Sequence, residues 1–192
     1  MNLSNRSQHR LFFAFDFSED FQQQLDSWCA TQPINGRRIP RYNYHLTLFF
    51  VGAVQNHRVV DLIDAVTLPE IRPFTLSCNK TGYFPRQELL FCEIEQGQEQ
   101  VQIVAKHLQR TLQSHFGKRE KKRYLPHISI ARDARPPVDF LVSPPLTTTI
   151  SQFCLMESLT LKSGVYYETV MSWPLYTPSD KEILLGAQKK ES

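Results

Sequence analysis

The sequence predicts an α+β fold of two pseudo-symmetric lobes, each an antiparallel sheet with helices, around a central cleft. One four-residue pattern occurs twice, at His45–Leu48 and at His127–Ile130, and reads histidine, aliphatic, hydroxyl, aliphatic. Each copy follows an apolar segment typical of a strand, then a helical pattern, then a basic loop. Apolar alternation and hairpin-like spacings favour antiparallel sheets. The length suits two small lobes that share an interface, so we expect a single bilobal domain over 1–192, with loosely ordered tails at 1–9 and 178–192.

The first unit opens with an aromatic-rich strand over residues 10–17. Ser18 is expected to begin a helix that ends near Ala30, because two acidic residues follow it in the first turn. Residues 31–44 contain two prolines and a glycine, and we predict a loop there, basic in its second half.

The later elements follow from the same signals of period, proline and glycine. In order, we expect a strand over 45–51 ended by Gly52, a helix over 56–66, strands over 74–80 and 88–95 joined by a turn around Gly82 and Pro85, a helix over 98–115 ended by Gly117, a strand over 127–131, an irregular segment over 133–145, and a hairpin of strands 150–158 and 165–175 around Gly164.

The two motifs have the composition of an acid–base site. Side chains alternate across a strand, so His45 shares a face with Thr47, and His127 with Ser129, while the aliphatic residues anchor each strand in its lobe. An imidazole exchanges a proton near pH 7, so one histidine can take a proton from water while the other gives one to a leaving oxygen. The hydroxyls can hold phosphate oxygens, and no metal or other cofactor is needed.

Arg132 and Phe50 each lie five residues after a motif histidine. Strict alternation places Arg132 on the face opposite His127, so it can join the site only if the strand ends or bulges there. For Phe50 the residues alone favour packing in the core. The other histidines form no comparable pattern, and we interpret them as surface or structural residues.

The charge is unevenly placed, although the net charge is only +3. The segments before the two motifs carry eight Lys and Arg against one Glu, which is 8 − 1 = +7, so the remainder sums to −4. Two basic loops that lead into the same histidine motif favour an anionic ligand.

The sequence also carries information about the cellular compartment of the protein. The polar segment over 1–10 lacks the apolar core of a signal peptide, and no apolar run approaches the roughly 20 residues that span a bilayer. Four scattered cysteines without a C-x-x-C pair are expected to be reduced and buried. We therefore expect a cytoplasmic protein with no membrane partner, and a monomer.

The paired motifs resemble those of the two-histidine (2H) phosphoesterase superfamily. More closely, the chain is similar to the bacterial RNA 2',3'-cyclic phosphodiesterases, historically called 2'-5' RNA ligases. The resemblance covers nearly the whole chain and rests on the segments Arg10–Ala14, His45–Gly52, Pro126–Arg132 and Leu155–Ser158, and on Tyr167-Glu168. It implies two pseudo-symmetric lobes and metal-independent hydrolysis of a terminal ribose 2',3'-cyclic phosphate to a 2'-phosphate, with 2'-5' ligation in some members.

The resemblance also implies roles for individual residues. His45 is expected as the proton donor to the 3'-oxygen and His127 as the proton acceptor from water, although the near symmetry of the site leaves the reverse assignment open. The expected phosphate-binding residues are Thr47, Ser129 and Arg132, and the expected substrate-lining aromatic is Phe50. Ser129 stands where threonine is usual, which keeps the hydroxyl but removes the β-branch that restricts χ1.

The expected partner is an RNA with a 2',3'-cyclic phosphate end, or a small cyclic nucleotide. Two other functions stay open from the residues. One is a non-catalytic RNA-binding module that uses the basic loops, which predicts strongly salt-dependent binding without turnover. The other is a metal hydrolase with the histidines as ligands, although no carboxylates accompany them at ligand spacing.

Overall fold

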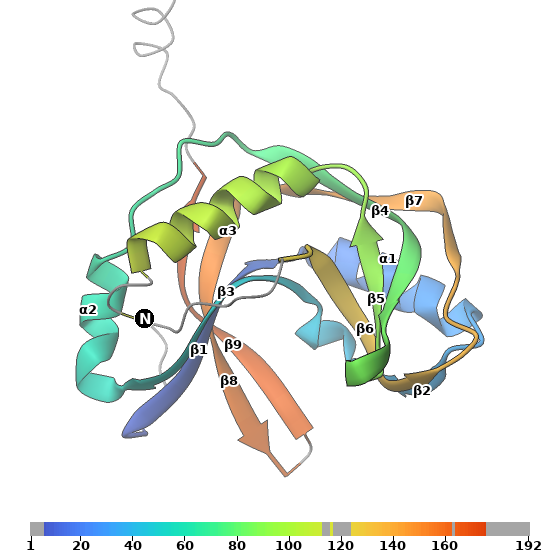
Figure 1. Cartoon of the computed structure of the whole chain (residues 1–192), viewed down its shortest axis with the longest axis horizontal. Coiled ribbons are helices and arrows are strands. Elements are labelled where there is room, and N and C mark those ends of the chain that lie inside the picture. The colour runs from blue at the N-terminus through green and yellow to red at the C-terminus, as the bar shows by residue number, and fades with distance from the viewer. Residues whose placement is uncertain (1–5, 113–115, 117–123, 163, 176–192) are drawn as a thin grey trace, which may run out of the picture.

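The computed structural model describes residues 6–112, 116, 124–162 and 164–175, and Figure 1 shows their arrangement. The elements are β1 (Gln8–Asp16), α1 (Glu19–Thr31), β2 (Asn35–Arg38), β3 (His45–Gln55), α2 (Val59–Asp64), β4 (Phe74–Phe84), β5 (Leu89–Ile94), α3 (Gln98–Leu112), β6 (His127–Arg135), β7 (Leu141–Ile150), β8 (Gln152–Leu161) and β9 (Gly164–Pro174), with short 3-10 helices η1 (Arg41–Asn43), η2 (Asn56–Arg58) and η3 (Pro85–Gln87).

The strands form two antiparallel sheets, one in each lobe. The first sheet has the order β3-β1-β8-β9, and the second has the order β2-β6-β5-β4-β7. The first motif opens β3 and the second opens β6, so each motif strand pairs with the strand that begins its own unit, β1 or β5. The expected two-lobed α+β architecture is confirmed.

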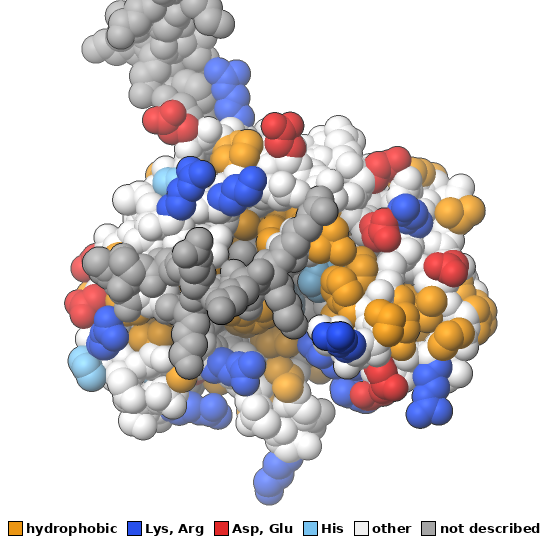
Figure 2. Space-filling view, in the orientation of Figure 1, with side chains coloured by type: hydrophobic (Ala, Val, Ile, Leu, Met, Phe, Trp, Pro, Cys, Tyr) orange, Lys and Arg blue, Asp and Glu red, His pale blue; other side chains and the backbone are white. Residues whose placement is uncertain are grey.

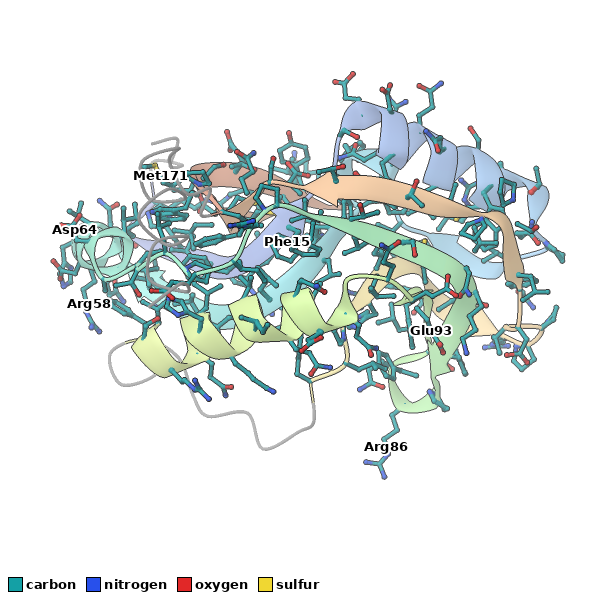
Figure 3. All side chains as sticks on the ribbon, turned by 90° about the horizontal axis from the view of Figure 1, so that it is seen from above. Phe15, Arg58, Asp64, Arg86, Glu93 and Met171 are labelled. Atoms are coloured by element: carbon teal, nitrogen blue, oxygen red, sulfur yellow. The ribbon has the colours of Figure 1, made fainter. Side chains whose placement is uncertain are left out.

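The two units exchange their helices. α1 follows β1 of the first sheet but contacts β7 of the second, while α3 follows β5 of the second sheet but contacts β3 of the first. Figure 3 shows α1 and α3 on opposite sides of the strands. β2 also crosses over, because it pairs with β6 of the second sheet.

A shared core connects the lobes at the motifs. The aliphatic residues of both motifs, Leu46, Leu48, Ile128 and Ile130, are all at most 4 % exposed and belong to one buried cluster. Strands β3 and β6 are also in contact. The motif aliphatics therefore anchor the strands as expected, and they do so in one core rather than in two.

Several expected elements are confirmed with small shifts. Ser18 caps α1 through a hydrogen bond from the backbone N–H of Phe21 to its hydroxyl. The hairpin of β8 and β9 turns at Gly164, with strand bounds close to those expected. The expected end of a helix at Gly117, the basic loop over 118–123 and the tail from 178 lie outside the described residues.

The predicted loop over 31–44 was wrong at its centre, because residues 35–38 form β2. The sequence Asn35-Gly-Arg-Arg has no apolar residue to signal a strand. β2 is an edge strand held by backbone pairing to β6, so it needs no buried side chain. Arg38 of this strand makes an ion pair with Asp26 of α1.

Two glycines were wrongly placed at strand ends. β3 continues past Gly52, whose φ of +88° accommodates a bulge within the strand. Gly82 lies inside β4, opposite Phe91 of β5. The turn between β4 and β5 is made by η3, which follows Gly82 in the chain. The positive φ of Gly52 is one that favours glycine. At Gly82 a side chain would clash with the ring of Phe91, which fills the space there.

The predicted irregular segment over 133–145 was wrong at both ends and is confirmed only over 136–140. β6 runs on to Arg135, and β7 includes Pro144 and Pro145. Because β7 pairs only with β4, it is an edge strand, where a proline can leave its missing N–H on the open side.

Candidate active site

His45 lies at the start of β3, half-buried between two aromatic rings. Its ring centroid is 5.1 Å from that of Phe12 on β1 and 4.7 Å from that of Tyr167 on β9. Its Nδ1 is 2.8 Å from the carbonyl oxygen of Asn43, and its Nε2 is 3.1 Å from Oγ1 of Thr47. Histidine and threonine therefore share one face, as the alternation predicts.

His127 occupies the equivalent place at the start of β6. Its ring is 5.2 Å from Phe84 and 5.1 Å from Phe91, and these two rings stack on each other at 4.4 Å. Its Nδ1 is 2.8 Å from the carbonyl oxygen of Leu125. Figure 2 shows a histidine among hydrophobic side chains near the middle of one face of the molecule, with Lys and Arg side chains beside them.

The same local geometry fixes the tautomer of both histidines. In each motif, Nδ1 faces the backbone carbonyl two residues earlier, at Asn43 and at Leu125. A carbonyl can only accept, so Nδ1 carries a proton and donates it. Nε2 is then the atom of each ring that takes up or releases a proton.

A bulge in each motif strand changes which residues face the site. In β3, Phe13 pairs with Phe49 and Ala14 with Thr47, so Leu48 is the extra residue. In β6, the register shift lies between Leu90 and Phe91 of β5, which pair with Ala131 and Ser129, so Ile130 is the extra residue. Both bulges fall at the fourth motif position, and both place two buried residues in succession.

The bulges bring the fifth residue after each histidine to the face of that histidine. Arg132 is exposed and close enough that its charge lowers the pKa of both His45 and His127. The bulge that the sequence required for Arg132 to join the site is therefore present. Phe50 is 52 % exposed, with its ring 6.0 Å from that of Phe12, so the interpretation of Phe50 as a core residue was wrong. The bulge turned it outward, against Phe12, whose ring also packs on His45.

The site disfavours positive charge on the histidines. The pKa of His45 is lowered to about 4, chiefly by burial and further by the charges of His127 and Arg132, against the opposing effect of the Asn43 carbonyl. The pKa of His127 is also lowered, by burial and by Arg132, and the Leu125 carbonyl opposes this shift. A bound phosphate anion would offset these charges, so the site is suited to an anionic ligand.

Asn43 was missed by the sequence analysis. Its buried side chain donates to the Val165 carbonyl at 2.7 Å and accepts from the Tyr167 N–H at 3.2 Å. It thereby holds η1 on the edge of β9, while its own carbonyl orients His45. Tyr167 was part of the resemblance, but its packing on His45 was not foreseen. No local signal in the sequence marks Asn43, because its side chain acts through β9, more than 120 residues later in the chain.

Tyr124 was also missed. Its hydroxyl donates to the backbone carbonyl of Thr47 at 2.8 Å and so connects the segment before the second motif to the strand of the first. Burial raises its pKa, so the hydroxyl stays a neutral donor.

The remaining histidines and the cysteines have other surroundings. His9 is buried and bonds Glu157 at 2.8 Å and Asn56 at 3.1 Å, while His107 bonds Thr67 at the surface. These are structural and surface positions, as interpreted, and His57 is exposed, while His115 lies outside the described residues. All four cysteines are free and buried, as expected.

Within the described ranges, no group of three or more His, Cys, Asp or Glu side chains is arranged to hold a metal ion. No helix in the same part of the chain is long and apolar enough to cross a membrane. An open pocket of about 480 Å³ lies between α1 and β7, and its lining residues, Asp20, Gln23, Gln24, Ser27 and Leu146, include no residue of either motif.

A family model of the 2'-5' RNA ligase superfamily matches residues 17–160, a range that contains both motifs. The chain belongs to this superfamily. A curated RNA 2',3'-cyclic phosphodiesterase of Escherichia coli (strain K12) is 27 % identical over 173 residues, which cover 86 % of this chain and 96 % of that protein. One of Thermotoga maritima is 22 % identical over 175 residues, covering 84 % and 92 %.

Solved structures support the same placement for this superfamily member. E. coli LigT complexed with 3'-AMP superposes with a TM-score of 0.77 at 26 % identity, covering 88 % of this chain and 99 % of LigT. LigT in its apo form superposes with a TM-score of 0.74, also at 26 % identity, covering 90 % and 100 %. The two-lobed fold is therefore that of LigT.

Proposed function

We propose that this chain hydrolyses the 2',3'-cyclic phosphate at the end of an RNA to a 2'-phosphate, by acid–base catalysis between His45 and His127. The observation that carries the proposal is the paired geometry of the motifs. Two histidines from two lobes each direct Nδ1 to a backbone carbonyl and so leave Nε2 for proton transfer, Nε2 of His45 lies 3.1 Å from Oγ1 of Thr47, and the charge of Arg132 acts on both rings. The curated relatives named RNA 2',3'-cyclic phosphodiesterase support the substrate class.

In the proposed reaction, a water oxygen attacks phosphorus while Nε2 of His127 removes its proton. The bond between phosphorus and the 3'-oxygen breaks, and Nε2–H of His45 gives that oxygen its proton, which leaves a 2'-phosphate and a free 3'-hydroxyl. Each proton transfer contributes roughly 10²–10⁴-fold to the rate. Thr47, Ser129 and Arg132 bind the non-bridging oxygens, on which charge develops. Phe50 lines the substrate beside His45.

His45 can act as the proton donor only when the substrate is bound. In the free protein its pKa of about 4 leaves it neutral at pH 7. The anionic phosphate restores the proton by attraction and by offsetting the charge of Arg132. The reverse assignment gives the same products with water at Nε2 of His45 and the 3'-oxygen at Nε2 of His127, so the two histidines are best treated as a pair that shares one proton.

The test is product analysis on a defined oligoribonucleotide that ends in a 2',3'-cyclic phosphate, with chelator-treated protein. The expected product is a 2'-phosphate, resolved from the 3'-phosphate by chromatography. Binding of the oligoribonucleotide without any turnover would instead support a non-catalytic RNA-binding module. Loss of turnover in the chelator, restored by a divalent ion, would support a metal hydrolase.

The same chemistry allows ligation. If a 5'-hydroxyl of a second RNA replaces water as the nucleophile, the same P–O3' bond breaks and a 2'-5' linkage forms. We further propose a monomer that acts in the cytoplasm, and the four free cysteines agree with the second part of this proposal.

A further inference from the structure

Two exposed tyrosines lie at the border of the site, and nothing in the proposed reaction uses them. Tyr42 of η1 is 58 % exposed and Tyr166 of β9 is 39 % exposed. Their ring centroids are 5.6 Å apart, at an interplanar angle of 44°. They come from segments more than 120 residues apart in the chain, yet they form one aromatic pair at the surface.

The pair is held at a fixed place relative to His45. Asn43, the residue after Tyr42, bonds the backbone of β9 on both sides of Tyr166, at Val165 and at Tyr167. The same Asn43 accepts the Nδ1–H of His45. Tyr167, the residue after Tyr166, packs on the His45 ring. Each tyrosine is thus one residue away from a direct neighbour of the reacting histidine.

The edge strand β9 lies between the tyrosine pair and His45. Adjacent residues of β9 point to opposite faces, so Tyr167 faces His45 while Tyr166 faces Tyr42. A ligand that reaches the tyrosines from the histidines must therefore pass over the edge formed by η1 and β9. The pair is therefore matched with the next nucleotide of a chain, rather than with the nucleotide whose phosphate is held at the histidines.

The chemistry of the pair suits a nucleobase. Bases stack on exposed aromatic rings without regard to sequence, because every base has a π-face. Arg41, which precedes Tyr42, is exposed and supplies a positive charge for the phosphate that joins two nucleotides. A tyrosine pair also presents a rigid face at little cost in conformational entropy.

We propose that Tyr42 and Tyr166 form a stacking subsite for the nucleotide that precedes the cyclic-phosphate end of the RNA. The proposal rests on the proposed function for the position of the cyclic phosphate. It makes an oligoribonucleotide, rather than a nucleoside 2',3'-cyclic monophosphate, the preferred substrate.

The test compares two substrates with the wild type and with Tyr42→Ala, Tyr166→Ala and the double variant. For a dinucleotide that ends in a 2',3'-cyclic phosphate, kcat/KM is expected to fall by roughly 5- to 150-fold in the double variant, the range for loss of one stacked base. For a nucleoside 2',3'-cyclic monophosphate, kcat/KM should stay within about twofold, because stacking concerns only the second base. Tyr42→Phe and Tyr166→Phe keep the rings and should keep both activities.

A substrate change provides the matched control. A dinucleotide whose first sugar carries no base should be a poor substrate for the wild type, and the double variant should reduce its turnover no further. Equal losses on both substrates in the double variant would show that the tyrosines only support the fold of the site. No loss on either substrate would equally overturn the subsite.

Direct binding separates this proposal from the proposed function. The affinities of a nucleoside 2'-monophosphate and of the corresponding dinucleotide 2'-phosphate can be measured by calorimetry, without turnover. The dinucleotide should bind more tightly to the wild type, and the double variant should lose that difference. Wild-type protein that shows this difference but hydrolyses neither substrate would contradict the proposed function alone, whereas equal affinities would contradict the subsite alone.

Discussion

The phenolic hydroxyl of Tyr124 donates a 2.8 Å hydrogen bond to the backbone carbonyl of Thr47. Tyr124 stands three residues before the second motif histidine, and Thr47 is the hydroxyl residue of the first motif. The bond therefore sets the spacing between the two halves of the site directly, in addition to the shared core beneath them.

Tyr124→Phe should lower kcat/KM for a cyclic-phosphate dinucleotide by about tenfold, because small displacements of reacting groups are costly to the rate. The free energy of unfolding should fall by about 1 kcal/mol for the lost hydrogen bond. Steady-state kinetics and chemical denaturation measure the two effects.

Tyr83→Phe is the matched control for Tyr124→Phe. The hydroxyl of Tyr83 donates to the carbonyl of Ala134, also at 2.8 Å, within the second lobe. Its loss should lower stability by a similar amount and leave kcat/KM within about twofold, since the bond does not join the motifs. Equal kinetic losses in the two variants would remove the special role of Tyr124.

His45→Ala and His127→Ala should each lower kcat by at least about 10²-fold, because each removes one proton transfer. The variants should still bind the substrate, as measured by fluorescence anisotropy at low salt. His107→Ala is the control, since His107 bonds Thr67 at the surface and belongs to neither motif. Turnover that survives either motif substitution would contradict the acid–base pair.

The pH profile of kcat/KM should be bell-shaped and centred on the acid side of neutrality. Catalysis needs one proton on the pair, and in the free protein burial and the charge of Arg132 lower the pKa of both histidines below 6.5, that of His45 to about 4. The profile of kcat, which reports the bound complex, should lie at higher pH because the phosphate anion raises both pKa values. Coincident profiles of kcat and kcat/KM would contradict this electrostatic account.

Folding stability should decrease as the pH falls from 6.5 to 4. Over this window the unfolded chain binds a proton at His45 that the folded chain does not, because the folded pKa is lowered from 6.5 to about 4. The loss is roughly 2–3 kcal/mol at most for one such group. His45→Gln should flatten this part of the curve in denaturation experiments at several pH values, and an unchanged slope would contradict the shift.

Arg132→Gln should lower kcat/KM by at least about tenfold and raise the pKa of both histidines. Its guanidinium is the proposed partner of the developing phosphate charge, and its positive charge lowers both pKa values in the free protein. NMR titration of the imidazole signals measures the second effect. Arg135→Gln, at the end of the same strand, should leave both measurements nearly unchanged, and a similar response in the two variants would argue against a specific role for Arg132.

The sequence predicted the fold class and the central part of the site because both depend on local patterns. Alternation placed Thr47 beside His45, and the repeated motif indicated two lobes. The bulges could have been recognised where the alternation of apolar and polar residues is interrupted. Leu48-Phe49 and Ile130-Ala131 are each two apolar residues in succession, beginning at the last position of a motif. That signal would have placed Phe50 and Arg132 on the site face.

The parts that could not be predicted depend on contacts between distant segments. β2 has no apolar side chain and exists only because β6 offers a free edge, and the prolines of β7 are tolerated only because β7 is itself an edge. Asn43 matters through the backbone of β9, more than 120 residues later in the chain. Neither kind of relationship leaves a local signal in the sequence.

The crossing of α1 and α3 has a consequence for how the duplicated halves can exist. A fragment cut between β3 and β4 would keep β1, β3 and α1 but lose α3, which covers β3, and it would carry α1 without the β7 surface that α1 contacts. Each half depends on the other for its packing, so neither should fold alone. Co-expression of the two halves should recover a soluble, active complex that neither half forms by itself. The ancestral single unit that such a repeat suggests would then have had to pair as a domain-swapped homodimer, with two identical histidines facing each other across its twofold axis.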